Sequence, residues 1–226
     1  MVEERAPASV STPRTLVLLR HGQTSWNLER RAQGHSDVEL DDTGHAQAAA
    51  AAPYLAGLAP ALLWSSDLAR ARQTAEYVAK EAAVELRLDP RLREFDLGER
   101  TGLTMTEFAE AFPEEYREFR AGHYDVVPGG EARADVIARV TASVEEALAA
   151  LSPGECGVVV GHGGALKVSV LEMLGWSEGA AAALQALDNC GWAVLQDSGV
   201  DRRLRLAAWN RTAPEPPDFV STPGVG

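Results

Sequence analysis

Cysteine and long apolar runs are scarce in this chain, and both limit what the protein can be. The chain has 2 cysteines in 226 residues. Cys156 and Cys190 lie far apart with no partner at metal-ligand spacing, so we expect free thiols and no metal site. No apolar run is long enough to span a bilayer, and residues 1–14 contain Pro and Ser where a signal peptide needs an apolar core. We therefore expect a cytoplasmic protein.

Excess positive charge is also lacking. The formal net charge is −12 at pH 7, whereas nucleic acids and anionic membranes need an extended positive field on their partner. We therefore expect no nucleic-acid and no membrane partner, and any bound anion must lie in a local pocket. With 46% hydrophobic residues, the chain is able to bury one sizeable core, so a single domain accounts for its length.

The order of the expected elements indicates the fold class. Strands are predicted at 15–19, 61–64, 84–88 and 157–160, helices at 43–57, 67–83, 131–151 and 165–174, and a terminal hairpin at 192–195 and 204–209. This alternation is typical of an α/β three-layer sandwich, a mostly parallel mixed sheet with helices on both faces. The domain is predicted to span 15–212 between mobile tails, 1–14 and 213–226. Within it, a helical insertion is predicted at about 104–130, and whether it is a lid is left open.

Polar side chains follow three of the predicted strands. Arg20 and His21 end the first strand, Ser65 and Ser66 end the second, and His162 follows the strand at 157–160 between glycines. The carboxyl ends of parallel strands meet at one edge of the sheet, which is where open α/β sheets bind ligands. We therefore expect these residues to face an anion. Solvated polar residues at strand ends are the alternative.

Helix starts are predicted to add to the same edge. Arg70 lies one turn into a helix for which Ser66 is the expected N-cap, whereas Arg72 points to another face and is expected in solvent. The helices that begin near Thr24, Ser66 and Gly164 are expected to direct free N–H groups and positive dipole ends to this edge. The combined site suits a dianionic phosphate.

Five ordered motifs carry a resemblance to a known family. They are Leu19–Thr24, Gln33-Gly34 with Leu40–Gln47, Ser65–Ala71, Arg93-Glu94 with Gly98 and Gly102-Leu103, and Val160–Gly164. On these motifs the chain resembles the histidine phosphatase superfamily, in its phosphoglycerate mutase-like branch and phosphatase subgroup, from Thr15 to about Asn210. The resemblance implies that His21 accepts a phosphoryl group and then loses it to water.

The residue types suit that chemistry. A neutral imidazole offers a lone pair near physiological pH, which fits His21 as a nucleophile that splits the reaction into two steps. Guanidinium groups bind phosphate oxygens bidentately and stay charged, which fits Arg20 and Arg70 as a clamp. His162 is expected to complete the clamp, either as a cation or as a neutral donor.

Proton transfer requires a further group. Glu94 is expected to protonate the leaving alkoxide and then to activate water, provided that burial or a like charge raises its pKa. Asp96 and Glu99 lie close in sequence and are its rivals.

The resemblance separates the polar residues that are expected to contact the substrate from those that match no motif. Substrate contacts are expected from Arg20, Asn27, Gln33, Gly34, Arg70, His162 and Gly163. His35, His45 and His123 match no motif, so we expect them at the surface.

These roles predict a metal-independent, histidine-type acid phosphatase that hydrolyses a small phosphorylated metabolite through a phosphohistidine, with no cofactor. The alternatives are a phosphoglycerate mutase and a catalytically silent module that only holds phosphorylated ligands. The chain has Arg100-Thr101 where many relatives have Trp-Glu, and by spacing Leu97 and Met105 stand where mutases have a tyrosine and a lysine. Leu97 and Met105 cannot pair with a carboxylate, which favours the hydrolase. The substrate and the formation of a homodimer are left open.

Overall fold

One mixed sheet organises the computed structural model, which describes residues 12–177, 179, 183–197 and 203–213. Its strands are β1 (Thr15–Arg20), β2 (Leu62–Ser65), β3 (Leu86–Leu88), β4 (Cys156–Gly161), β5 (Trp192–Asp197) and β6 (Leu204–Arg211). They lie in the order β3-β2-β4-β1-β5-β6. The first four in this order are parallel, and β5 runs antiparallel to both of its neighbours. The predicted terminal hairpin is thus confirmed, although 198 and 199 of its expected turn lie outside the described residues.

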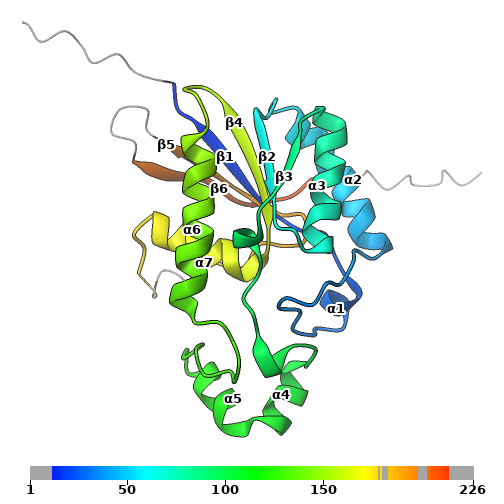
Figure 1. Ribbon diagram of the computed structural model, residues 1–226, viewed down its shortest axis with the longest axis vertical. Helices are drawn as coiled ribbons and strands as arrows, with labels where there is room; N and C mark the ends of the chain where they lie inside the picture. Colours follow the sequence, from blue (N-terminus) through cyan, green and yellow to red (C-terminus); the bar gives the residue numbers. More distant parts are fainter. Residues whose placement is uncertain (1–11, 178, 180–182, 198–202, 214–226) are drawn as a thin grey trace, which may run out of the picture.

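Helices cover both faces of this sheet. Helices α2 (Asp42–Ala56) and α3 (Ala69–Ala82) lie on one face, and α6 (Arg133–Ala149) and α7 (Gly163–Met173) lie on the other (Figure 1). In β1, Val17 and Leu19 join the core on the α2 and α3 side, whereas Leu16 and Leu18 join the core on the α6 and α7 side. A strand buried on both faces needs a continuous apolar run, which explains its sequence. The three-layer α/β sandwich is confirmed.

The predicted insertion forms two short helices beyond the carboxyl edge of the sheet (Figure 1). They are α4 (Met105–Ala111) and α5 (Pro113–Arg120). Thr104 and Glu107 form a capping box at the start of α4, and Pro113 opens α5. Phe108 is fully buried and its ring contacts those of Tyr116 and Phe119. This small aromatic core holds the two helices together.

Helix α3 begins later than expected, at Ala69, with Leu68 as its N-cap. The prediction of Ser66 as the N-cap is therefore wrong. The Asp37 carboxylate, from the loop after α1 (Ser25–Leu28), accepts the Ala69 N–H at 2.6 Å. The Ser66 hydroxyl lies instead 2.9 Å from His162 Nε2. A residue distant in sequence supplies the cap, so local spacing could not indicate it.

Arg14 lies at the boundary of the predicted N-terminal tail and is held by the domain. Its backbone N–H and its Nε donate to the Asp197 carboxylate at 2.9 and 2.7 Å, and its Nη1 donates to the Leu148 carbonyl oxygen at 3.0 Å. Residues 1–11 and 214–226, the rest of the predicted tails apart from 12, 13 and 213, lie outside the described residues.

The pairing of the strands fixes the functional edge. Arg20 of β1 pairs with Gly161 of β4, and Ser65 of β2 pairs with Val160 of β4. The three strand exits therefore lie side by side, as expected. The loop that follows β3 adds two short 3₁₀ turns, η1 (Pro90–Leu92) and η2 (Gly98–Arg100), between the sheet and the insertion.

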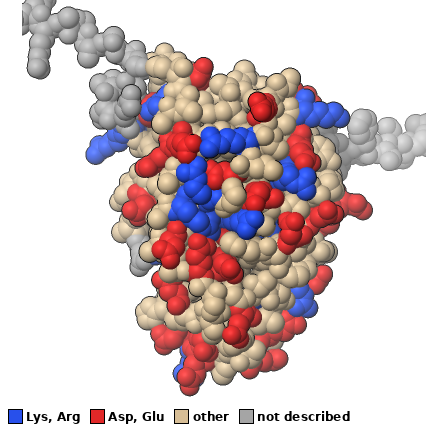
Figure 2. Space-filling view, viewed as in Figure 1, with Lys and Arg blue, Asp and Glu red and all other residues tan. Residues whose placement is uncertain are grey.

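The surface has no extended basic region on the face that Figure 2 shows. Lys and Arg gather in the middle of this face, and acidic side chains surround them. In the part of the chain that the structure describes, no helix is long and apolar enough to cross a membrane.

Candidate active site

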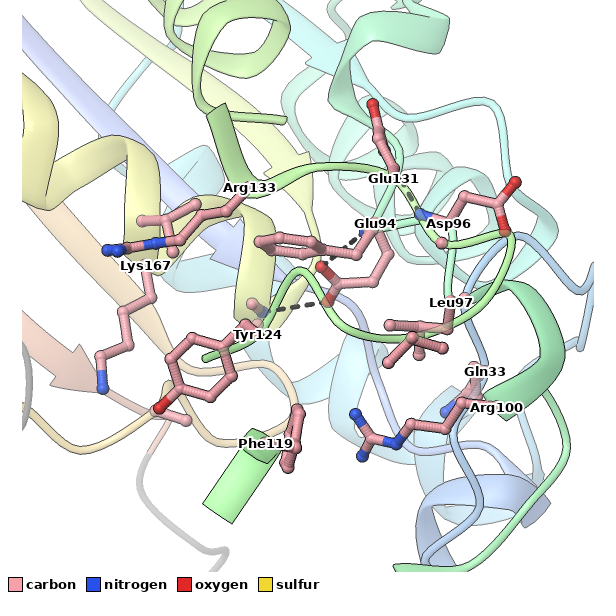
Figure 3. Close-up of a pocket in the computed structure, with 18 of the residues that line it drawn as sticks. Gln33, Glu94, Asp96, Leu97, Arg100, Phe119, Tyr124, Glu131, Arg133 and Lys167 are labelled. Carbon is pink, nitrogen blue, oxygen red and sulfur yellow. Dashed lines mark hydrogen bonds between the residues drawn. The ribbon is translucent and has the colours of Figure 1, made fainter. Parts of the chain in front are cut away.

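A cavity of about 680 Å³ opens at the carboxyl edge of the sheet. In Figure 3, Glu94 lies near its centre, Arg100 and Lys167 lie on opposite sides, and Phe119 and Tyr124 border it. Eight of the residues that the sequence predicted line this cavity, namely Arg20, His21, Asn27, Gln33, Gly34, Arg70, Glu94 and Gly163. His162 lies behind the wall, with its ring centroid 5.2 Å from that of His21.

His21 is a buried, neutral imidazole with a fixed orientation. Its Nδ1 lies 2.7 Å from the Gly22 carbonyl oxygen, which can only accept, so Nδ1 carries the proton and Nε2 keeps the lone pair. Burial, followed by the charges of Arg70 and Arg20, lowers the pKa of His21 well below its usual range. A neutral histidine with a free Nε2 is the form that attacks a phosphorus atom.

Arg20 and Arg70 bring two guanidinium groups to His21. Arg20 Nη1 donates to the Leu187 carbonyl oxygen at 2.6 Å, and Arg70 donates to the Ser36 and Gly34 carbonyl oxygens at 2.7 and 2.8 Å. Burial lowers the pKa of Arg70 to about 10, which leaves it charged at neutral pH. The buried Nε atom of each guanidinium has no partner in the described part of the protein. Both groups are held by carbonyl oxygens and retain donors for an anion.

His162 is a buried, neutral imidazole, which argues against the cationic role that the sequence left open. Burial, followed by the positive charge of Arg70, lowers the pKa of His162 well below its usual range. Its Nε2 lies 2.9 Å from the Ser66 hydroxyl, whereas its buried Nδ1 has no partner among the described residues. The Ser66 hydroxyl is able to donate to Nε2, and in that arrangement Nδ1 carries the proton.

Glu94 caps helix α7 and does not stand free in its loop. Its carboxylate accepts the N–H groups of Gly164 and Phe95, both at 3.0 Å (Figure 3). It also accepts the N–H group of Ala165 at 2.8 Å. The expectation that free N–H groups at the start of this helix would face a phosphate is therefore wrong, because Glu94 takes them. The same applies to α3, where Asp37 takes the Ala69 N–H. A carboxylate bound to a helix start is nevertheless fixed in position against the cavity.

The predicted substrate contacts lie in the cavity wall. The buried Gln33 Oε1 has no partner among the described residues, and Gly34 has a φ of +50°, which glycine tolerates best. Asn27 Oδ1 accepts from Thr24 and from Asn189. Asn189 also donates to the His21 carbonyl oxygen at 3.1 Å, so it ties these two residues together, and the sequence carried no signal for it.

The rivals of Glu94 and the unassigned histidines have different surroundings. Glu99 is exposed and lies outside the cavity lining, whereas Asp96 lines the cavity and accepts the Gly98 N–H. His123 is exposed, as expected. His35 is half-buried, with 31% of its side chain exposed and its Nε2 2.8 Å from the Glu94 carbonyl oxygen. His45 is also half-buried and contacts the Tyr77 hydroxyl.

Arg72 and the two cysteines lie outside the cavity. Arg72 is exposed and pairs with Glu76, as predicted. Cys156 and Cys190 are free thiols, and burial raises the pKa of Cys190 to about 12. In the described ranges of the chain, no group of three His, Cys, Asp or Glu residues is arranged to hold a metal ion.

Several residues of the cavity wall were not predictable as parts of the site from the sequence. Arg100 and Lys167 bring two cations, and Phe119 and Tyr124 bring an aromatic pair with centroids 5.1 Å apart. For Arg100, the sequence did hold a signal, because Arg100-Thr101 stands where many relatives have Trp-Glu. The position of Phe119 and Tyr124 depends on how the insertion folds over the site, which no local pattern indicates.

Comparison with known proteins defines the class. The model of the histidine phosphatase superfamily (branch 1) matches residues 16–212. A glucosyl-3-phosphoglycerate phosphatase of Mycobacterium tuberculosis is 37% identical over 213 residues, covering 88% of this chain and 96% of that protein. A probable phosphoglycerate mutase of Cronobacter sakazakii is 38% identical over 177 residues, covering 76% of this chain and 80% of that protein. The structure of a mycobacterial glucosyl-3-phosphoglycerate phosphatase with VO3 has a TM-score of 0.79 at 36% identity, covering 88% and 100% of the two chains.

The chain belongs to the histidine phosphatase superfamily, branch 1. Within this family it is a hydrolase of small phosphomonoesters, as its similarity to phosphatases over most of its length shows.

Proposed function

We propose that His21 is the nucleophile of a two-step phosphomonoester hydrolysis. In the first step, His21 Nε2 bonds to phosphorus, the bond from phosphorus to the ester oxygen breaks, and the acid form of Glu94 gives its proton to the leaving oxygen. In the second step, a water oxygen bonds to the phosphorus of the phosphohistidine and the bond from phosphorus to His21 Nε2 breaks. Glu94 takes a proton from that water, and inorganic phosphate leaves. His21 and Glu94 then return to their starting states.

One observation carries this proposal. Three buried nitrogen atoms without a partner among the described residues lie on the groups around His21, namely Arg20 Nε, Arg70 Nε and His162 Nδ1, and the two guanidinium Nε–H groups are donors. Unsatisfied buried donors are costly and rare in folded proteins. A phosphate dianion would satisfy both guanidinium donors, and it would accept from His162 Nδ1 in the tautomer that carries the proton there, while the two guanidinium charges balance its two negative charges.

Hydrolysis is favoured over transfer back to the substrate. A mutase must hold its product and keep water from the phosphohistidine. A three-carbon acid would leave most of the cavity volume of about 680 Å³ free. Each water occupies roughly 30 Å³ in the liquid, so the remaining volume has room for water beside the substrate. Leu97 contributes an apolar wall to this cavity, and Met105 is not part of the lining. Water can therefore reach the intermediate.

The substrate that we propose to test first comes from the relatives. The M. tuberculosis protein named above is a glucosyl-3-phosphoglycerate phosphatase, and the aromatic pair Phe119 and Tyr124 in the cavity wall offers faces on which a sugar ring packs. We propose that the chain acts on a phosphorylated metabolite of this kind. A cytoplasmic location and a homodimer stay predictions.

The decisive experiment follows both fates of the phosphoryl group. The enzyme is incubated with 3-phosphoglycerate and a trace of 2,3-bisphosphoglycerate, and 2-phosphoglycerate and free phosphate are measured over time. We expect phosphate to form and 2-phosphoglycerate to stay at the level of the enzyme-free control. Isomer that forms faster than phosphate, at the rate of the best hydrolysis substrate, would establish the mutase instead. Rapid acid-sensitive trapping of labelled phosphate on wild-type protein, absent in His21→Ala, tests the intermediate itself.

A further inference from the structure

Arg100 is a cation of the cavity wall that has no acidic partner among the described residues. It ends η2, and its side chain extends toward the cavity beside Phe119 (Figure 3). Its guanidinium carbon lies 4.5 Å from the centroid of the Phe119 ring and 5.4 Å from that of Phe108. The guanidinium therefore lies against aromatic rings, which attract a cation but do not neutralise its charge.

The hydrogen-bonding capacity of Arg100 is mostly unused. Within the described ranges, its Nη2 donates to the Met105 sulfur, at 3.3 Å, and a thioether is a weak acceptor. Its Nε is buried and has no partner in the described part of the chain. Burial lowers the pKa of Arg100, but an arginine stays protonated at neutral pH. Arg31, another cation of this wall, differs because it pairs with Glu29 and Glu107.

The loop that carries Arg100 is fixed in place. The Glu99 N–H donates to the Pro128 carbonyl oxygen at 3.0 Å, and Leu97 forms a β-bridge with Gly130. Gly98 has a φ of +47°, and a Cβ there would lie 2.2 Å from the Pro128 oxygen, so only glycine permits this close approach. The guanidinium is thus held against the cavity before any ligand arrives, which lowers the entropy cost of binding.

We propose that Arg100 binds a carboxylate of the substrate, so that the enzyme prefers phosphomonoesters of carboxylic acids. This proposal rests on the phosphatase activity proposed above. Charge balance favours a carboxylate over a second phosphate. Arg20 and Arg70 supply two positive charges for the dianionic phosphate, whereas Arg100 supplies one, which matches a monoanion. A planar guanidinium stacked on an aromatic ring presents its edge, and a carboxylate binds that edge bidentately.

Pairs of phosphomonoesters that differ mainly in a carboxylate test the proposal. The pairs are 3-phosphoglycerate with glycerol 3-phosphate and phosphoserine with phosphoethanolamine. The ratio of kcat/KM within each pair is measured for wild type, Arg100→Met, Arg100→Lys and the control Arg72→Met, which removes an exposed arginine outside the cavity. Hydrogen bonds to charged groups contribute about 1.5–3 kcal/mol, so we expect Arg100→Met to lower the ratio about 10- to 100-fold, mainly through KM.

The variants separate recognition from folding. Methionine keeps apolar contact with Phe119, and circular dichroism checks that each variant is folded. Arg100→Lys keeps the charge without the bidentate edge, so an intermediate ratio is expected, and this variant decides the matter if Arg100→Met does not fold. Arg72→Met should keep the wild-type ratio.

Binding without turnover separates this proposal from the proposed chemistry. Dissociation constants of the same compounds are measured by calorimetry with His21→Ala and with His21→Ala combined with Arg100→Met. If wild type hydrolyses no compound but Arg100→Met still weakens binding of the carboxylated members selectively, the chemistry is wrong and the recognition stands. A ratio unchanged by Arg100→Met, or binding of no carboxylated member, overturns the role of Arg100. A wild-type preference for fructose 1,6-bisphosphate over fructose 6-phosphate that Arg100→Met abolishes would assign the group to a second phosphate and also overturn it.

Discussion

At the scale of single residues, burial decides the protonation state of the two central histidines. His21 and His162 are 4% and 0% exposed, and the guanidinium groups of Arg20 and Arg70 lie beside them. Both desolvation and positive neighbours disfavour an imidazolium, so both pKa values fall. The result is that the proposed nucleophile, His21, is held unprotonated next to a second imidazole that adds no charge.

Glu94 gives a residue-scale prediction that depends on the leaving group. Glu94→Gln removes the transferable proton but keeps one oxygen that can accept from the start of α7. We expect kcat/KM for glycerol 3-phosphate to fall about 10²- to 10⁴-fold, the range typical of general acid–base catalysis. The loss should be at least tenfold smaller for 4-nitrophenyl phosphate, because a nitrophenolate leaves without a proton. Equal losses for both substrates would make Glu94 a positioning residue.

At the scale of elements, the contact between Glu94 and the start of α7 links the loop after β3 to the sheet. Gly164 leaves room for this contact, since a Cβ at this position would lie 2.8 Å from Glu94 Oε1. Gly163 is required for a different reason, since a Cβ there would lie 3.3 Å from Arg20 Nε. The two glycines after His162 thus make room for two different side chains. The motif that marks the family is thus also a packing requirement of the site.

We predict that Gly164→Ala lowers kcat for phosphomonoesters about tenfold or more without unfolding the protein. The added methyl group forces the Glu94 carboxylate away from α7, and misplacement of a catalytic group by about 1 Å costs on the order of 10²-fold. Gly57→Ala is the matched control, because Gly57 follows α2 with a φ of −60° and its added Cβ would meet the Pro53 oxygen only at 3.3 Å. Steady-state kinetics and thermal unfolding of both variants make the comparison, and equal activity of the two would refute the role of this contact.

At the scale of the whole molecule, the site is a small positive region in an acidic protein. The net charge is −12, yet two guanidinium groups converge at one edge of the sheet. The sheet makes this possible because neighbouring parallel strands direct their carboxyl ends to the same place. The two buried histidines also affect the stability of the entire fold.

Stability should fall as the pH decreases from 7 to 5. The unfolded histidine pKa is about 6.5, and both folded pKa values lie well below it, so in this window the unfolded state binds more protons. Each histidine then contributes a loss of up to about 1.4 kcal/mol per pH unit, which is absent above pH 6.5 and ends below the folded pKa. Urea unfolding at pH 7.0, 6.0 and 5.0 measures this slope. His162→Asn should reduce the slope by about half, and an unchanged slope would contradict the assignment.

The sequence by itself determined the fold class and the edge of the sheet at which the candidate active site lies. The continuous apolar run of β1 required burial on both faces, and Arg20 and His21 at its end had to reach the ligand edge. These conclusions depend on local pattern and on the direction of parallel strands. For this reason the sandwich and its strand exits were predictable.

Only the tertiary structure decided which groups meet across long separations. The binding of Glu94 to α7, the capping of α3 by Asp37, the bond between Ser66 and His162 and the half-buried position of His35 all join distant segments. The direction of Arg100 depends in turn on Phe119 and on the turn at 128–130. Such contacts follow from how layers and loops pack in three dimensions, and no periodicity or spacing in the sequence encodes them locally.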